Sequence, residues 1–180
     1  MKINQKKFYF QKSHGFTLME MLITIMLFSF IMAGVYAVTA AGENSWQVNQ
    51  VKIELQQEMR KAMDNMIHEL RQAGDSSIVN VPADNTWYTT VTFRTPAGVS
   101  SGSINWNADT IQFVRGGANN EYLQRVSSST KTICQDMQSL QFRRQSTSPD
   151  ILEVAMQAQK NTVKGAVVNY DLNFSIQLRN

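Results

Sequence analysis

The 180-residue sequence contains a single cysteine, Cys134, so no disulfide can form within the chain. A domain without a disulfide must be held together by its own hydrophobic core. Cys134 lies in the segment 132–136, whose residues suit a β-strand. We interpret it as a small, buried apolar residue. An intermolecular bridge and a reactive thiol are the alternatives.

Histidine is almost as scarce, with only His14 and His68 in the whole sequence. A metal cluster would therefore need carboxylates from distant segments. The sequence also lacks a nucleophile elbow, and Gly116-Gly117 has no phosphate-loop context. We expect a protein that is not an enzyme and that uses no cofactor and no metal.

Acidic residues are missing from the first 15 positions, whereas Lys2, Lys6, Lys7 and Lys12 all lie there. Of the 17 basic residues in the chain, this stretch holds four, which leaves 13 basic against 14 acidic residues. The basic character of the sequence therefore belongs to its first segment. Nucleic acid is not expected as a partner on grounds of charge.

The segment from Met21 to Ala41 has no charged residue over 21 positions. About 20 apolar residues are enough for a helix to span a bilayer. Because the lysines flank only its N-terminal side, the positive-inside rule predicts a cytoplasmic N-terminus and an exported remainder. A secretory signal would have a shorter apolar region followed by a small-residue cleavage site.

Glu20 stands at the edge of this apolar segment, where a carboxylate is costly unless it lies near the interface or finds a cationic partner. Cleavage after Gly15 would create such a partner, a new α-ammonium group on Phe16. Glu20 of one subunit could then pair with Phe16 of the next. Such a charge pair would set the axial register of packed apolar helices.

The residues Gly15-Phe16-Thr17-Leu18-Met19-Glu20, after a short lysine-rich leader, resemble the type IV prepilin family, which includes type II secretion pseudopilins and competence pilins. The resemblance covers about 30 residues, from the leader into the apolar segment. The alternative is a plain signal-anchor helix in which the glutamate stands by chance.

The resemblance implies that prepilin peptidase cleaves after Gly15 and N-methylates Phe16, and that Glu20 is the family's assembly glutamate. It also implies a single-pass inner-membrane protein with a periplasmic C-terminal domain, which later joins a cell-envelope filament. The implied partners are the peptidase, other major and minor pilins or pseudopilins, the inner-membrane assembly platform, and membrane lipid before assembly. One departure is Ala37 in the middle of the apolar segment, where many major pilins have a proline nearby.

The sequence predicts one long helix over residues 16–73, spanning the membrane at about 17–41 and amphipathic at 43–73. In the amphipathic part, apolar residues recur at spacings of three and four between charged residues, which indicates a helix with one buried face. Gly74-Asp75 is the predicted stop signal. Residues 1–15 would form the cleavable leader and residues 74–180 a periplasmic β-rich domain.

Beyond the helix, we predict short strands joined by turns. The last strand is the clearest, because apolar residues alternate strictly with polar ones from Tyr170 to Leu178. The predicted fold is α+β and pilin-like, with an antiparallel sheet packed on the C-terminal half of the helix. The predicted strands are 87–95, 110–115, 122–126, 140–144, 151–157 and 170–178, and the turns are 98–102, 116–120, 147–150 and 160–165.

Three hypotheses for the function follow. The first is a structural minor subunit of a type IV pilus or type II secretion pseudopilus, with a role in initiation or at the tip left open. The segments 136–142 and 174–180 are similar to those of the J-type pseudopilin and the W-type minor pilin. The second is a DNA- or surface-binding minor pilin, and the third is a membrane-tethered periplasmic enzyme. The candidate DNA-contacting residues are Arg143, Arg144, Lys160, Lys164, Trp87 and Trp106.

Overall fold

The computed structural model describes residues 15–179, and the leader predicted at 1–15 therefore lies, except for Gly15, outside the described residues. The chain divides into two compact units, one ending at Glu43 and the other beginning at Asn44. Helix α1 (Leu18–Leu70) supplies residues to both units. The second unit also contains a short 3-10 helix, η1 (Asp75–Ser77), and all seven strands.

Helix α1 confirms the prediction of one long N-terminal helix, although it ends at Leu70 rather than at Ala73. Its last turn loosens through hydrogen bonds from Gln72 N to Glu69 O and from Ala73 N to Leu70 O. Gly74 then adopts an extended backbone conformation rather than a left-handed cap. A Cβ at Gly74 would lie 2.6 Å from the Trp106 ring, so close packing explains this glycine better than a stop signal does.

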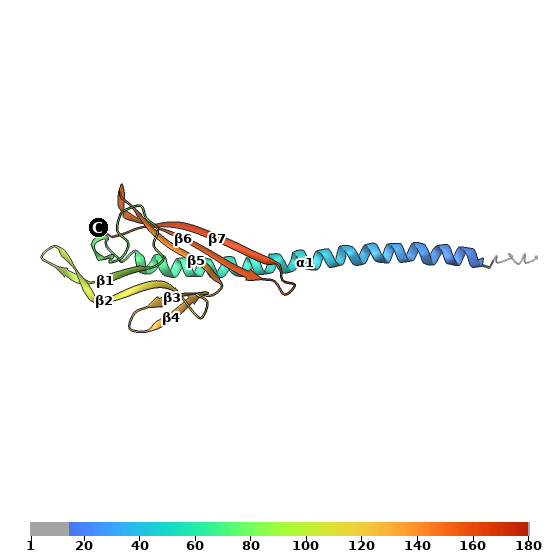
Figure 1. Ribbon diagram of the computed structural model, residues 1–180, viewed down its shortest axis with the longest axis horizontal. Helices are drawn as coiled ribbons and strands as arrows, with labels where there is room; N and C mark the ends of the chain where they lie inside the picture. Colours follow the sequence, from blue (N-terminus) through green and yellow to red (C-terminus); the bar gives the residue numbers. More distant parts are fainter. Residues whose placement is uncertain (1–14, 180) are drawn as a thin grey trace, which may run out of the picture. The chain divides into compact units, whose positions relative to one another are not determined.

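The strands confirm the predicted α+β, pilin-like arrangement of a long helix followed by antiparallel strands, although they form two sheets rather than one. The first has the order β1-β2-β3-β4, and the second has the order β5-β6-β7. Both sheets flank the C-terminal part of α1 (Figure 1). The strand bounds are Val91–Ser100 (β1), Ser103–Gly116 (β2), Tyr122–Val126 (β3), Thr130–Cys134 (β4), Met137–Gln145 (β5), Ser148–Asn161 (β6) and Val167–Gln177 (β7).

The first predicted strand is misplaced at both ends. Tyr88, expected within it, pairs instead with Phe142 of β5 through backbone hydrogen bonds of 2.8 and 2.7 Å. Strand β1 continues to Ser100 because register shifts on both sides of Pro96 keep it paired with β2. The turn at 98–102 narrows to Ser101-Gly102, which have φ values of 52° and 81°. Two consecutive positive φ values are typical of a tight hairpin turn.

One apolar stripe of α1 forms the centre of the core. It repeats at spacings of three and four residues, as the sequence predicted, and all of its members are buried. Side chains from both sheets cover it, including the stacked rings of Phe93 and Phe113, whose centroids are 5.8 Å apart. The stripe consists of Leu55, Met59, Ala62, Met66 and Leu70.

Candidate functional site

The predicted cleavage junction lies immediately before α1. Gly15, Phe16 and Thr17 have no regular secondary structure, and the side chains of this segment are exposed. Apart from Gly15 itself and its chain neighbours, no heavy atom of the described residues lies within 4 Å of the position a Cβ would take on Gly15. This segment is therefore exposed and would not have to unfold from a helix before a cleavage after Gly15.

Thr17 caps the N-terminus of α1. Its Oγ1 accepts a hydrogen bond of 3.3 Å from the Glu20 backbone N–H, and its carbonyl accepts one of 3.1 Å from Met21 N. Thr17 and Glu20 thus have the spacing of a capping box, with Glu20 in the first turn. A carboxylate there is stabilised by the helix dipole, by about 0.3–1 kcal/mol at an exposed position. The sequence carries the corresponding signal, Thr-x-x-Glu, at Thr17 and Glu20.

Phe16 precedes the helix, so the spacing of four residues does not place it on the same helical face as Glu20. In the uncleaved chain its nitrogen belongs to a peptide bond and carries no positive charge. The ammonium that would pair with Glu20 exists only after cleavage. The pair of Phe16 and Glu20 therefore stays a prediction about the processed protein.

The first unit offers no cover for its own apolar residues. From Leu18 to Val38 the large apolar side chains are all at least half exposed. The serine and threonine hydroxyls inside this part of the helix, by contrast, are satisfied within it, because each donates to the carbonyl four residues earlier. The three bonds are Thr24 Oγ1 to Glu20 O at 2.7 Å, Ser29 Oγ to Ile25 O at 2.8 Å and Thr39 Oγ1 to Val35 O at 2.9 Å.

A helix with an apolar surface all round and internally bonded hydroxyls is suited to lipid or to packing among similar helices. Helix α1 is long and apolar enough to cross a membrane by length and composition, with a mean hydropathy of 2.3 over its most apolar window.

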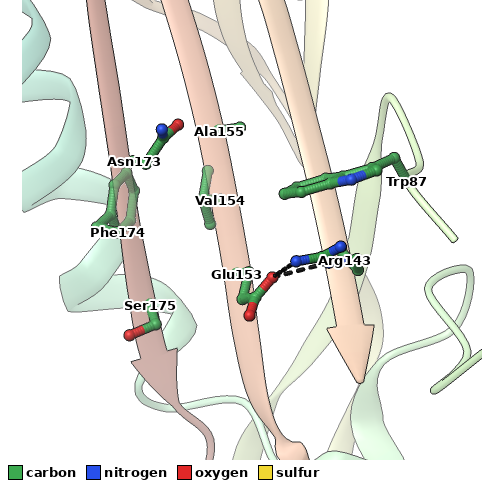
Figure 2. A pocket seen from close by; sticks show the side chains of 8 residues that line it. All are labelled: Trp87, Arg143, Glu153, Val154, Ala155, Asn173, Phe174 and Ser175. Atoms are coloured by element: carbon green, nitrogen blue, oxygen red, sulfur yellow. Dashed lines mark hydrogen bonds and ion pairs between the residues drawn. The ribbon is translucent and has the colours of Figure 1, made fainter. Parts of the chain in front are cut away.

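A shallow pocket of about 390 Å³ lies on the outer face of the β5-β6-β7 sheet (Figure 2). The Trp87 ring covers Arg143, whose Cζ is 4.4 Å from the ring centroid. Arg143 donates to Glu153 Oε2 through Nε at 2.8 Å and Nη2 at 2.5 Å. Gln145 Nε2 donates to the other oxygen of Glu153 at 2.6 Å. The charges within this pocket therefore already have partners.

The residues suggested for DNA contact do not form one basic surface. Arg144 is buried, makes an ion pair with Asp75 and donates to Val81 O at 3.1 Å. Its pKa is lowered because burial penalises the charged form. Lys160 binds Glu54 at 2.6 Å. Trp106 packs against Gly74. Arg144 and Lys160 are therefore already engaged with acidic partners.

Cys134 is buried, as the sequence predicted. Burial, with the nearby negative charges of Glu58 and Asp136, raises the pKa of its thiol to about 12. The thiolate, which is the reactive form, is therefore strongly disfavoured. Within residues 15–179, no group of three or more histidine, cysteine, aspartate or glutamate side chains is placed to hold a metal ion.

Comparison with protein families gives one match, the prokaryotic N-terminal methylation motif, at residues 10–36. This range includes Gly15, Phe16 and Glu20 and ends within the apolar segment. No curated protein and no solved structure matches the chain. The motif suggests a structural subunit rather than an enzyme and, with the apolar helix, fits a membrane-anchored single-pass protein. The chain thus carries a prepilin-type methylation motif, which supports a type IV pilin-like protein.

Proposed function

We propose that this chain is a structural minor pilin or pseudopilin, processed by prepilin peptidase and assembled with other pilins into a type IV pilus or a type II secretion pseudopilus. The observation that carries the proposal is the order of three features along the chain. An exposed, non-helical Gly15-Phe16 junction precedes a capped helix start, and a helix with no cover of its own follows.

In this proposal, residues 1–15 are the leader, residues 16–73 carry the anchor and the amphipathic helix, and residues 74–180 lie in the periplasm. The leader stays in the cytoplasm until the peptidase cleaves after Gly15 and methylates Phe16. The apolar part of α1 then exchanges lipid for the apolar helices of neighbouring subunits. The exchange is favourable only if Glu20 is not left alone in an apolar environment, because an unpaired charge there is costly.

The structure allows two roles of the first turn to be separated. The Thr17 cap uses the hydroxyl of Thr17 and the backbone of Glu20, whereas the proposed assembly pair uses the carboxylate of Glu20. Thr17→Ala removes the cap and keeps the charge. Glu20→Gln removes the charge and keeps both the cap and the size of the side chain. Glu20→Ala removes the carboxylate group altogether.

We expect Glu20→Gln and Glu20→Ala to be cleaved like the wild type but to be depleted from the sheared filament fraction by about tenfold or more, since one charge pair contributes about 1.5–3 kcal/mol as a charge-assisted hydrogen bond. Thr17→Ala should lose helix stability of about 1 kcal/mol, yet still be incorporated. Immunoblots of whole cells and filament fractions measure both steps. Normal incorporation of Glu20→Gln would refute the proposed charge pair.

A further inference from the structure

The turn between β6 and β7 holds a valine out into solvent. Thr162, at the base of the turn, is buried, and its backbone N–H donates to Ala166 O at 2.8 Å. The turn is closed further by bonds from Gly165 N to Thr162 O at 2.9 Å and from Ala166 N to Thr162 Oγ1 at 3.0 Å. Val163 is nevertheless 96% exposed. The closed turn thus fixes this apolar side chain in an exposed position.

This turn lies at the end of the second unit where α1 enters it (Figure 1). At the other end, Arg179 N donates to Ala73 O at 2.8 Å, which places the end of β7 beside the end of the helix. The twelve residue-to-residue steps from Val167 to Arg179 cover about 40 Å of strand. The same distance takes about 27 residues of helix. Val167 therefore lies near the level of Trp46.

Trp46 lies at the same height along α1 as Val167, on the face of the helix opposite the buried stripe. Its side chain is 71% exposed. Trp46 precedes Leu55 of the buried stripe by nine residues, or two and a half helical turns, so it lies on the face of α1 opposite the stripe. It also follows Ala41, the last residue of the uncharged segment, by five residues, or about 7.5 Å of helix. The interfacial layer on each side of a bilayer is about 5–7 Å thick, and tryptophan is enriched there.

We propose that, before assembly, this end of the second unit rests on the bilayer, with the β6-β7 turn and Trp46 in the lipid headgroup layer. The inference rests on the proposed membrane anchor and adds a second contact to it. Val163 enters the layer on the sheet side and Trp46 on the opposite side of α1. What supports the contact is their position, because both side chains lie next to the end of the apolar segment and tryptophan is enriched in this layer.

The chain provides a matched control for this contact. Val99 is another exposed valine close to a tight turn, with 67% of its surface accessible. The β1-β2 turn near it lies beside Asp75, because Asp75, Gly102 and Ser103 line one pocket. Val99 therefore belongs to the end of the unit beyond the C-terminus of α1, far from the proposed lipid contact.

The experiment uses the full chain in vesicles of phosphatidylcholine and phosphatidylglycerol. Val163→Cys, Val99→Cys and Ser29→Cys are each labelled with an environment-sensitive fluorophore, and lipids with a nitroxide on the headgroup serve as quenchers. The unsubstituted chain, treated in the same way, measures any labelling of buried Cys134. Ser29 lies within the apolar segment and reports whether that segment is in the membrane.

We expect quenching at position 163 to exceed that at position 99 by about threefold or more, because tens of ångströms separate the two ends of the unit. Equal quenching at positions 163 and 99 would overturn the inference. If the Ser29→Cys label is in lipid while position 163 is in water, the anchor stands and only the second contact fails. If the Ser29→Cys label is also in water, both this inference and the proposed membrane anchor are wrong.

Discussion

Helix α1 contains two stretches of similar secondary structure that differ in their cover. From Leu18 to Glu43 the fold buries none of the large apolar side chains, whereas from Asn44 to Leu70 it buries a complete stripe. Two methionines show the difference in burial: the side chain of Met26 is 61% exposed, whereas that of Met66 is fully buried. The same residue type is thus used for two different environments.

The difference follows from the arrangement of charges along the helix. The first stretch is apolar on every side, so no single sheet could cover it. The second stretch confines its apolar residues to one face and places lysines, glutamates and glutamines on the others. A sheet domain of the same chain can cover one face. A surface that is apolar all round needs lipid or several neighbouring helices.

The methionine pair gives the largest expected effect. Met66→Ala should lower the free energy of unfolding of the second unit by about 2–5 kcal/mol, because it leaves a cavity in the core. Met26→Ala, a matched control in the first stretch, should leave that value unchanged. Urea unfolding of the full chain in detergent micelles, followed by tryptophan fluorescence, measures both. Equal losses for the two variants would contradict the division of the helix.

A second prediction concerns the reactivity of Cys134, the buried cysteine of β4. Because burial and the nearby negative charges of Glu58 and Asp136 raise the pKa of Cys134 to about 12, its thiolate should be rare at pH 8. Relative to an ordinary value of 9.0, the reaction with a disulfide reagent should be about a thousandfold slower in the folded protein than in urea. A ratio below about ten would mean that Cys134 is accessible.

The smallest effect concerns Glu58, a half-buried residue of α1 whose Oε2 has no hydrogen-bond partner. Burial raises the pKa of this carboxyl above its ordinary value of 4.5, while Lys160 partly opposes the shift. The folded state therefore binds this proton more tightly than the unfolded state does. That contribution to stability is complete below the unfolded pKa and is lost as pH rises through the folded pKa.

Urea unfolding from pH 4 to pH 7 can detect the contribution of Glu58. The stability of the wild type relative to Glu58→Gln should fall as the pH rises across this range. Asp64→Asn, which removes an exposed carboxylate from the same helix, is the matched control for the loss of a charge. A difference between wild type and Glu58→Gln that stays constant with pH would show that the proton is not linked to folding.

Much of the fold could be predicted from the sequence because its periodicities are strong. The alternation in β7 and the three-four spacing in α1 both reflect one buried face. Strand β3 was predicted with its observed bounds, Tyr122–Val126. The Thr17 cap could also have been predicted, because Thr17 and Glu20 have the Thr-x-x-Glu spacing of a capping box.

The remaining features of the fold and of the pocket depend on contacts between strands that are distant in the sequence, and local sequence patterns do not reveal these contacts. Strand β4 is short and mostly exposed, so it lacks the alternation that marks a buried face. The first half of β2 is rich in serine, asparagine and aspartate, and it is held in place by pairing with β1 across a two-residue turn. The division into two sheets is accompanied by a positive φ of 59° at Asp136, between β4 and β5. The pocket at Trp87 required three strands to be brought together.

We infer that the exposed apolar stretch of α1 belongs to a processed filament subunit. Mass spectrometry of the protein purified from membranes of its own host tests this most directly. We expect an N-terminus at Phe16 carrying a methyl group, about 14 Da heavier than the unmodified residue. An intact N-terminus at Met1, in cells whose other pilins are processed, would contradict it.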